Sequence, residues 1–251
     1  LRNCRDFYTM SKTILMKVTS RERPKQLLKT VKSYIEMAAN TTDMVWLFSF
    51  DSNDESYFNN VFILDLERLL GLTEHTDVKV YGYTSVLNYS NCAIVFGTSS
   101  GKINAINRDI KYYGCSWDIL LNISDDQRPI IKGYDNIIRN AMPDHLDASL
   151  WFTDGQPRVN TNEILGFNYY KRFNYIYHPD YVSLFCDNEA TEVAKILGKQ
   201  IKSNTQIVRH LHPAWCKVDG FSRDALYDRN DKFWKQDEAT FHARRKINFG
   251  L

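Results

Sequence analysis

Apolar runs with strand character alternate with segments of helical spacing through the first half of the chain. The runs that predict strands are residues 13–18, 44–50, 78–83 and 117–123, and the segments that predict helices are residues 26–37, 58–70 and 102–113. This alternation is typical of a largely parallel sheet covered by helices. Ligands of such sheets bind beyond the carboxyl ends of the strands. The sequence therefore predicts an α/β fold whose functional site lies along one edge of the sheet.

The second half of the chain is less regular, but it carries two helical segments. Residues 187–197 predict a helix that Asp187 or Asn188 could cap, and residues 233–248 predict a charged helix. No internal repeat, low-complexity segment or linker divides the chain. We therefore expect an irregular extension over residues 1–12 and one domain over residues 13–251.

Composition narrows the range of functions. The 251 residues are 43% hydrophobic, enough to bury a sizeable core, and the net charge is only +2, which disfavours a protein that depends on nucleic-acid charge alone. The five cysteines are widely spaced and include no CxxC pair. This pattern disfavours a disulfide framework or a structural zinc site, and it favours a reducing, cytoplasmic location. No apolar run approaches the roughly 20 residues that span a bilayer, and the first residues lack the apolar core of a signal peptide.

Three polar clusters follow predicted strands at the point where each strand ends. They are residues 19–23, 51–54 and 124–126, and in a parallel sheet they converge on one edge. The adjacent carboxylates of Asp125 and Asp126 would create a concentrated negative site at that edge. A hard cation such as Mg²⁺ or Mn²⁺ prefers oxygen ligands and shares them with phosphate oxygens. The alternative interpretation of this pair, taken alone, is a polar turn or a helix cap.

Two histidines late in the chain are candidates for the same metal site. Alternation places His210 and His212 on the same side of an extended segment, and Pro213 favours extended backbone before it. Either one could complete a metal site with Asp126. The alternative is a pair of surface or hydrogen-bonded histidines.

Two further groups have the chemistry of a transfer reaction. Asp187 and Glu189 form an acidic cluster, and a carboxylate near an acceptor hydroxyl can take its proton. The alternative is a charged first turn of a helix, which the helix dipole favours. Three cations, Arg21, Arg23 and Lys102, could donate charge-assisted hydrogen bonds to diphosphate oxygens, although any one of them alone is more simply a solvated charge.

The order of these clusters resembles that of the large inverting family of GT-A glycosyltransferases. Residues 18–24, followed by Leu27, Leu28 and Ser33, look like the first strand and helix of that family. Residues 50–54 look like the end of its second strand, where an aspartate recognises the base. Residues 102–107 look like the helix before its metal motif, and residues 117–126 are similar to the strand that carries its DxD signature. The resemblance covers most of residues 13–215.

Two motifs depart from the family pattern. The signature reads Ser124-Asp125-Asp126, so Ser124 replaces the first acid and Asp126 keeps the metal role. The usual Glu-Asp base motif reads Cys186-Asp187-Asn188-Glu189, which aligns Asp187 with the base.

The resemblance implies a GT-A (Rossmann-like) fold with a mainly parallel central sheet flanked by helices. Residues 13–126 would bind the nucleotide sugar, and residues 127–251 would bind the acceptor. The implied reaction is hexosyl transfer from a nucleoside diphosphate sugar to an acceptor hydroxyl, and a UDP-sugar is the expected donor. The transfer would invert the anomeric configuration and would require Mn²⁺ or Mg²⁺. The residues implied in nucleotide-sugar binding are Thr19, Ser20, Arg21, Arg23, Asp51, Asp54, Lys102, Asn107 and Asp125. The implied metal ligands are Asp126 and His212, with His210 as the fallback, and the implied base is Asp187, with Glu189 as the alternative.

Other functions remain open at this point. A nucleotidyltransferase of similar architecture would more typically carry a glycine-rich loop after the first strand, and residues 19–24 contain no glycine. A non-catalytic nucleotide-sugar-binding module and a retaining glycosyltransferase are further alternatives. The acceptor could be a glycan, a lipid-linked glycan or DNA with hydroxymethylated bases. The basic residues 242–246 are compatible with phosphate contacts, although a solvated helix end explains them more simply.

Overall fold

The computed structural model describes residues 11–73, 77–81, 84–112, 116–155, 157–213 and 223–251. The extension expected over residues 1–12 therefore lies almost entirely outside the described residues. The strands are β1 (Ile14–Thr19), β2 (Met44–Asp51), β3 (Asp77–Tyr81), β4 (Thr84–Asn88), β5 (Cys92–Gly97), β6 (Ile119–Ser124), β7 (Gln127–Pro129), β8 (Ser149–Phe152), β9 (Ile164–Gly166), β10 (Gln200–Ser203) and β11 (Val208–His210). The α-helices are α1 (Pro24–Met37), α2 (Asn60–Leu70), α3 (Lys102–Asn107), α4 (Tyr134–Ala141), α5 (Phe167–Phe173), α6 (Cys186–Ile196), α7 (Ala225–Asp231) and α8 (Trp234–Lys246).

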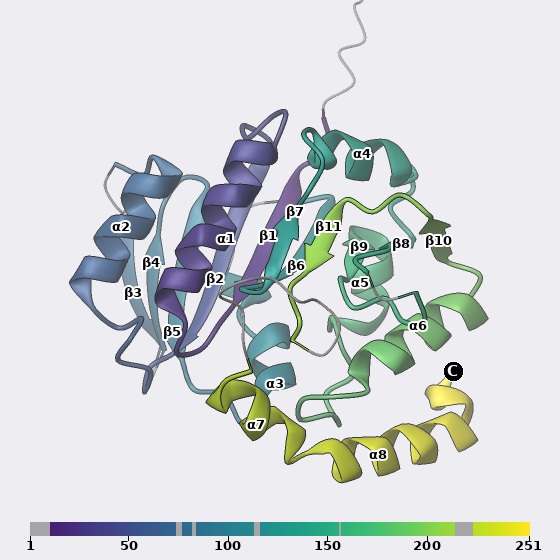
Figure 1. The fold of residues 1–251 in the computed structure, drawn as a ribbon. Coiled ribbons are helices and arrows are strands. Elements are labelled where there is room, and N and C mark those ends of the chain that lie inside the picture. The colour runs from purple at the N-terminus through teal and green to yellow at the C-terminus, as the bar shows by residue number, and fades with distance from the viewer. Residues whose placement is uncertain (1–10, 74–76, 82–83, 113–115, 156, 214–222) are drawn as a thin grey trace, which may run out of the picture.

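One nine-stranded sheet runs through the molecule in the order β10-β8-β9-β6-β1-β2-β5-β4-β3. Within it, β4 and β9 run against the direction of the other strands, so the sheet is mostly parallel as predicted. The register pairs Thr19 with both Ser49 and Ser124. The carboxyl ends of β6, β1 and β2 therefore meet at one edge, which faces α3 and α7 at the bottom of Figure 1.

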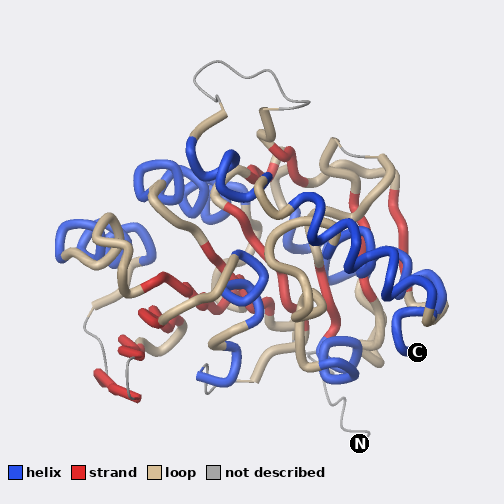
Figure 2. The backbone as a smooth tube through the Cα atoms, turned by 90° about the horizontal axis from the view of Figure 1, so that it is seen from below, coloured by secondary structure: helices blue, strands red, loops and turns tan. Residues whose placement is uncertain are grey.

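Helices cover both faces of this sheet (Figures 1 and 2). Ile14, Met16 and Val18 of β1 belong to the core under α1, α2 and α4, whereas Leu15 belongs to the core under α3, α5, α6 and α8. This alternation follows from the two-residue period of a strand. Because both faces are buried, β1 and β2 are almost continuously apolar.

Five strands of the sheet, β4, β5, β8, β9 and β10, and one helix boundary were not predicted from the sequence. The antiparallel pairs β3–β4 and β4–β5 extend the parallel centre at one edge, a meander that was not predicted. The helix expected over residues 102–113 ends at Asn107, because Arg108 is extended and Asp109 has a φ of 78°. A single 3₁₀ turn, Ile110–Tyr112, follows.

The prediction that Asp187 or Asn188 caps a helix is wrong. The helix α6 begins at Cys186 after Phe185, which has a φ of 60°, and no side chain caps it. Asp187 therefore lies inside the first turn, where a negative charge interacts favourably with the helix dipole.

The described part of the chain contains no helix that is both long and apolar enough to cross a membrane. Of the five cysteines, Cys92 and Cys186 are described, and both are buried free thiols.

A buried carboxyl group next to β9 makes the stability of the fold depend on pH. Burial raises the pKa of Glu163 from 4.5 to about 8, although Ser149 and Asn160 donate hydrogen bonds to it. Because the folded state holds this proton more tightly than the unfolded state does, the free energy of unfolding falls as pH rises from about 4.5 to about 8. We expect Glu163→Gln to be more stable than the wild type above pH 8, by on the order of a few kcal/mol.

Urea unfolding at pH 5 and pH 8.5 measures this difference. Glu55→Gln, at an exposed position, is the matched control and should leave the pH dependence unchanged. A stability gap between wild type and Glu163→Gln that does not grow with pH would show that Glu163 is not protonated in the folded protein.

Candidate functional site at the carboxyl edge of the sheet

The loop after β1 contacts the acidic pair that follows β6. Ser20 donates a hydrogen bond to Asp125, and Tyr57 donates one to the Ser20 hydroxyl at 2.6 Å. Arg23 Nη1 lies 3.0 Å from Asp125 Oδ1. The polar clusters after β1 and β6 are therefore joined directly, as their positions at parallel strand ends led us to expect.

The third cluster, after β2, joins the same loop on its other side. Arg21 Nη1 lies 2.7 Å from Asp51 Oδ2, and Ser99 donates a hydrogen bond to Asp51 Oδ1 at 2.5 Å. Asp54 accepts a hydrogen bond from the backbone N–H of Glu22 at 2.7 Å, which supports the positive φ of 60° at that residue. Asp54 thus shapes the loop, whereas Asp51 lies at the end of its strand between Arg21 and Ser99.

Asp126 is the most unusual carboxylate at this edge. It is only 4% exposed, and its Oδ2 accepts a hydrogen bond from the Tyr227 hydroxyl at 2.8 Å and lies 3.3 Å from His210 Nε2. Its Oδ1 is buried and has no hydrogen-bond partner among the described residues. Burial alone would raise the pKa of Asp126, but the His210 charge and these hydrogen bonds hold it well below the usual range. An ionised oxygen that has no hydrogen-bond partner among the described residues therefore lies at this edge.

Its neighbour Asp125 binds its proton more tightly. Burial and the adjacent Asp126 charge raise the pKa of Asp125 to about 6, although Arg23 and Ser20 partly offset the increase. Two adjacent buried carboxylates cannot both ionise freely, so the arrangement concentrates negative charge on Asp126.

The two histidines have opposite electrostatic environments. His210 lies between two carboxylates, with Nε2 3.3 Å from Asp126 and Nδ1 3.3 Å from Asp154, and these outweigh burial and raise its pKa to about 10. Burial and the nearby charges of His210 and Lys102 lower the pKa of His212 to about 4. The ring centroids of His210 and His212 lie 5.6 Å apart. At neutral pH, His210 is a cation and His212 is a neutral imidazole, which is the form that binds metals.

Asp187 belongs to the same electrostatic cluster. Burial raises its pKa, and the charges of Lys102 and His210 act in the opposite direction. The charge of Lys102 also lowers the pKa of His212. Lys102 of α3 therefore acts electrostatically on both Asp187 and the histidine segment, although it lies about 85 residues before Asp187 in the sequence.

Two of the residues singled out from the sequence, Glu189 and Asn107, make contacts that hold neighbouring segments in place. Glu189 forms a bidentate ion pair with Arg244, with N–O distances of 2.7 and 2.8 Å, and it accepts a hydrogen bond from Tyr181. The Asn107 side chain accepts hydrogen bonds from the N–H groups of Ile176 and Tyr177. Both side chains fasten surrounding segments to α6 and α3.

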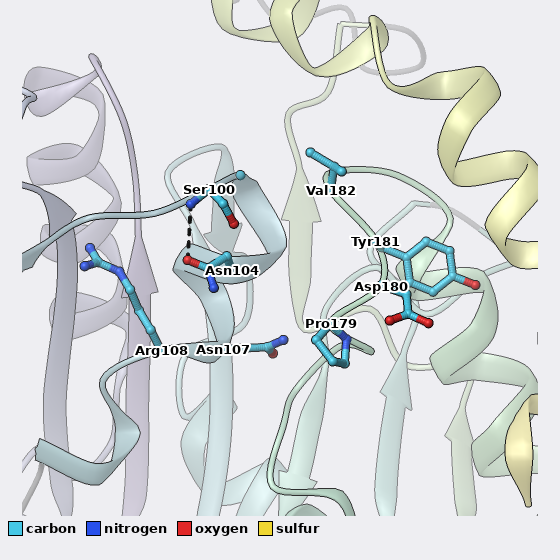
Figure 3. A pocket seen from close by; sticks show the side chains of 9 residues that line it. Ser100, Asn104, Asn107, Arg108, Pro179, Asp180, Tyr181 and Val182 are labelled. Carbon is cyan, nitrogen blue, oxygen red and sulfur yellow. Dashed lines mark hydrogen bonds between the residues drawn. The ribbon is translucent and has the colours of Figure 1, made fainter.

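A cavity of about 260 Å³ lies between α3 and residues 179–182 (Figure 3). Asn104, Asn107 and Arg108 line one side of it, and Tyr181 lies on the other. Arg108 connects this cavity to the strand-end cluster, because its Nη2 lies 3.5 Å from Asp51 Oδ1.

The contribution of α7 to this site was not predicted from the sequence. Asp224, which caps this helix, forms a bidentate ion pair with Arg23 at 2.6 and 2.8 Å, and the Arg23 guanidinium lies 4.6 Å from the centre of the Tyr227 ring. Arg229 contacts Glu22 at 3.0 Å. The sequence around Tyr227 does not indicate that its hydroxyl would donate a hydrogen bond to Asp126, which lies 101 residues earlier in the chain.

The residues present fit a divalent cation only if the substrate supplies ligands too. Among the described residues, no group of three His, Cys, Asp or Glu side chains is arranged to hold a metal. Asp126 Oδ1 and the neutral His212 nevertheless offer an oxygen and a nitrogen donor at one edge. Mg²⁺ and similar ions commonly take one or two protein carboxylates and complete their shell with phosphate oxygens and water.

Comparison with known proteins identifies the fold. No family model and no curated protein matches the sequence. Among solved structures, a mannosyltransferase from Pyrobaculum calidifontis in complex with GDP-Man and Mn²⁺ matches with a TM-score of 0.56 and 11% identity, over 80% of this chain and 57% of that one. Residues 1–349 of S. aureus TarS in complex with UDP match with a TM-score of 0.56 and 11% identity, over 78% and 60% of the two chains.

The chain thus spans less than two thirds of the length of these two solved chains. At these identities the likeness establishes the fold alone. The fold is of the GT-A (Rossmann-like) type, with a mostly parallel central sheet flanked by helices, as the sequence predicted.

Proposed function

We propose that the chain is a metal-dependent glycosyltransferase that moves a hexosyl group from a UDP-sugar to an acceptor hydroxyl with inversion. The observation that carries the proposal is the buried Asp126 carboxylate, which keeps one oxygen without a partner among the described residues. It lies at the carboxyl edge of a GT-A sheet, where cations and a second carboxylate converge. Structural neighbours solved with GDP-Man and Mn²⁺ and with UDP support the same ligand class.

The nucleotide sugar would bind along the loop after β1, within residues 13–126. Asp51 would accept a base N–H, and Thr19, Ser20 and Asp54 would define the shape of the loop. The diphosphate would contact three cations, Arg21, Arg23 and Lys102, because charge-assisted hydrogen bonds to phosphate are strong.

Asp126 and His212 would hold Mn²⁺ or Mg²⁺. The ion would supply Lewis-acid stabilisation of the negative charge on the departing diphosphate. Asp125, whose raised pKa keeps part of it protonated near neutrality, would hold the loop through Ser20 and Arg23 instead of binding the metal. Lys102 would add a fixed positive charge on the side of α3.

Residues 127–251 would supply the acceptor site and the general base. Asp187 would take the proton of the acceptor hydroxyl as its oxygen forms a bond to the anomeric carbon and the bond from that carbon to the diphosphate oxygen breaks. Its raised pKa suits this role, because a carboxylate that holds a proton more tightly is a stronger base. Glu189 is a poorer candidate, because Arg244 and Tyr181 already occupy its oxygens.

The choice between the two histidines leads to a prediction. We expect His212→Ala to weaken Mn²⁺ binding more than His210→Ala does, because both nitrogens of the His210 ring lie against carboxylates whereas His212 is neutral at pH 7. Titration of each variant with Mn²⁺ in the presence of UDP, followed by the electron paramagnetic resonance signal of free Mn²⁺, gives the two affinities. The opposite ranking would assign the metal to His210.

A thermal-stability screen tests the proposed function. Wild-type protein is heated with UDP, GDP, CDP or ADP, each with and without Mn²⁺. The proposal predicts the largest increase in melting temperature with UDP and Mn²⁺ together, because a ligand that binds only the folded state stabilises it. Asp51→Asn should reduce the shift, and Asp65→Asn, on the exposed side of α2, should not. No stabilisation by any nucleotide would reject the proposal.

A further inference from the structure

The Asp126 carboxylate is held at one of its two oxygens from two different elements. Tyr227 of α7 donates a hydrogen bond to Oδ2 at 2.8 Å, and His210 of β11 presents Nε2 to the same oxygen at 3.3 Å. A carboxylate fixed through one oxygen cannot rotate freely about its last bond. The other oxygen, Oδ1, is thereby turned to a fixed direction, where it has no partner among the described residues.

Asp154 holds His210 on the side of the ring that faces away from Asp126. Its Nδ1 lies 3.3 Å from Asp154 Oδ2, and its backbone N–H donates to the Asp154 carbonyl at 3.0 Å. Asp154 is only 2% exposed and also accepts a hydrogen bond from Thr161. The backbone hydrogen bond fixes the position of His210 on β11, and the contact at Nδ1 orients its ring, so that Nε2 faces Asp126. In metal centres a carboxylate often orients the histidine that binds the metal, and here the same kind of contact orients a histidine that holds the proposed metal-binding carboxylate.

Two ion pairs between α7 and the loop after β1 position Tyr227. Asp224 pairs with Arg23 at the beginning of the helix, and Arg229 pairs with Glu22 one turn later. The Tyr227 ring lies between the Arg23 guanidinium, at 4.6 Å, and the His212 ring, at 5.0 Å. The side chain is 8% exposed, so its hydroxyl is shielded from water at the point where it meets Asp126.

From this geometry we infer that Tyr227, Asp154 and His210 are positioning residues for the metal site. They orient Asp126 so that its Oδ1, and not its Oδ2, would bind the cation. The chain of contacts Asp154–His210–Asp126–Tyr227 joins the segment after β8, β11, the turn after β6 and α7. The inference rests on the proposed function, because it assumes that a cation binds at Asp126. Neither Asp154 nor Tyr227 touches the cation or the sugar in this arrangement.

The experiment measures Mn²⁺ affinity rather than turnover. Free Mn²⁺ is followed by electron paramagnetic resonance in titrations with saturating UDP, for the wild type, Tyr227→Phe and Asp154→Asn. Loss of a partner of a metal ligand commonly weakens metal binding about 10- to 100-fold, and we expect a weakening in this range for Tyr227→Phe. Asp154→Asn acts through His210 and should weaken binding by a smaller factor. The affinity for UDP without metal should stay near that of the wild type, because neither side chain would contact the nucleotide.

Two control variants separate this role from general structural damage. Tyr89→Phe removes a similar hydroxyl–carboxylate hydrogen bond, 2.6 Å to Glu67 and remote from the site, and should leave Mn²⁺ affinity unchanged. Arg229→Gln removes the ion pair between α7 and Glu22 but leaves the Tyr227 hydroxyl in place. If Arg229→Gln weakens Mn²⁺ binding as much as Tyr227→Phe does, docking of α7 and not the hydroxyl is responsible, and the inference is wrong.

The remaining outcomes distinguish the inference from the proposed function. Normal Mn²⁺ affinity in both Tyr227→Phe and Asp154→Asn, with tight binding by the wild type, would overturn the positioning role alone. No Mn²⁺ binding by the wild type with UDP present would overturn the metal site itself, and the inference would fail with it.

Discussion

Asp126→Asn is expected to reduce sugar transfer by on the order of 10³-fold or more. The substitution removes the charge that would hold the cation, and Lewis-acid stabilisation of a departing phosphate is worth several kcal/mol. Asparagine is preferable to alanine here because its side-chain oxygen can still accept the hydrogen bond from Tyr227. Alanine would also remove one of the two carboxylates that lie 3.3 Å from the buried His210 ring.

The measurement is release of UDP from a UDP-sugar in the presence of Mn²⁺ and a suitable acceptor. Asp65→Asn, on the exposed face of α2, serves as the control and should behave like the wild type. Circular dichroism establishes that both variants are folded. Near-normal turnover by Asp126→Asn would exclude Asp126 as the metal ligand.

Asp187→Asn is expected to reduce turnover by roughly 10² to 10⁴, the usual contribution of a positioned general base. The amide has nearly the same shape but cannot take the proton of the acceptor hydroxyl. Affinity for UDP should stay close to that of the wild type, because Asp187 lies on α6, whereas the nucleotide would bind along the loop after β1. Glu192→Gln, on the same helix, is the matched control and should leave turnover unchanged.

The same measurement on Glu189→Gln tests the alternative base. Because Glu189 pairs with Arg244, we expect this variant to lose thermal stability more than turnover. If Asp187→Asn kept near-normal turnover and Glu189→Gln lost it, the base would be Glu189. If neither variant mattered and the product retained the anomeric configuration of the donor, the single displacement would be wrong.

The sequence predicted the centre of the sheet because its strands are buried on both faces. The segments β1, β2 and β6 are short apolar runs, each ending in polar residues, and a parallel arrangement brings those ends together without further information. The joining of Ser20 to Asp125 and of Arg21 to Asp51 follows from that arrangement.

The remainder of the site depends on contacts between residues far apart in the sequence. Asp154 precedes a glycine and looks like an ordinary turn residue, but β11 packs next to it and places His210 against its carboxylate. Likewise, the sequence around Glu189 does not show that its carboxylate forms an ion pair with Arg244 of α8. Local spacing gives no information on either pairing, because the partners lie 56 and 55 residues away.

The helix break at Asp109 had a similar origin. The apolar spacing of residues 103, 106 and 110 continues past Asn107, so periodicity alone predicted one longer helix. In the structure, Arg108 leaves the helix to donate a hydrogen bond to the Phe50 carbonyl at 2.5 Å. A tertiary contact with β2 therefore outweighs the local helical pattern.

Metal-dependent release of UDP is the most direct test of the proposed function. Purified protein is incubated with a panel of UDP-sugars, with GDP-Man as a comparison, and UDP or GDP is quantified with Mn²⁺ and with excess EDTA. The proposed function predicts release of UDP from at least one UDP-sugar with Mn²⁺, loss of that release in EDTA, and little release by Asp126→Asn. Full release in EDTA, or equal release by Asp126→Asn, would contradict it.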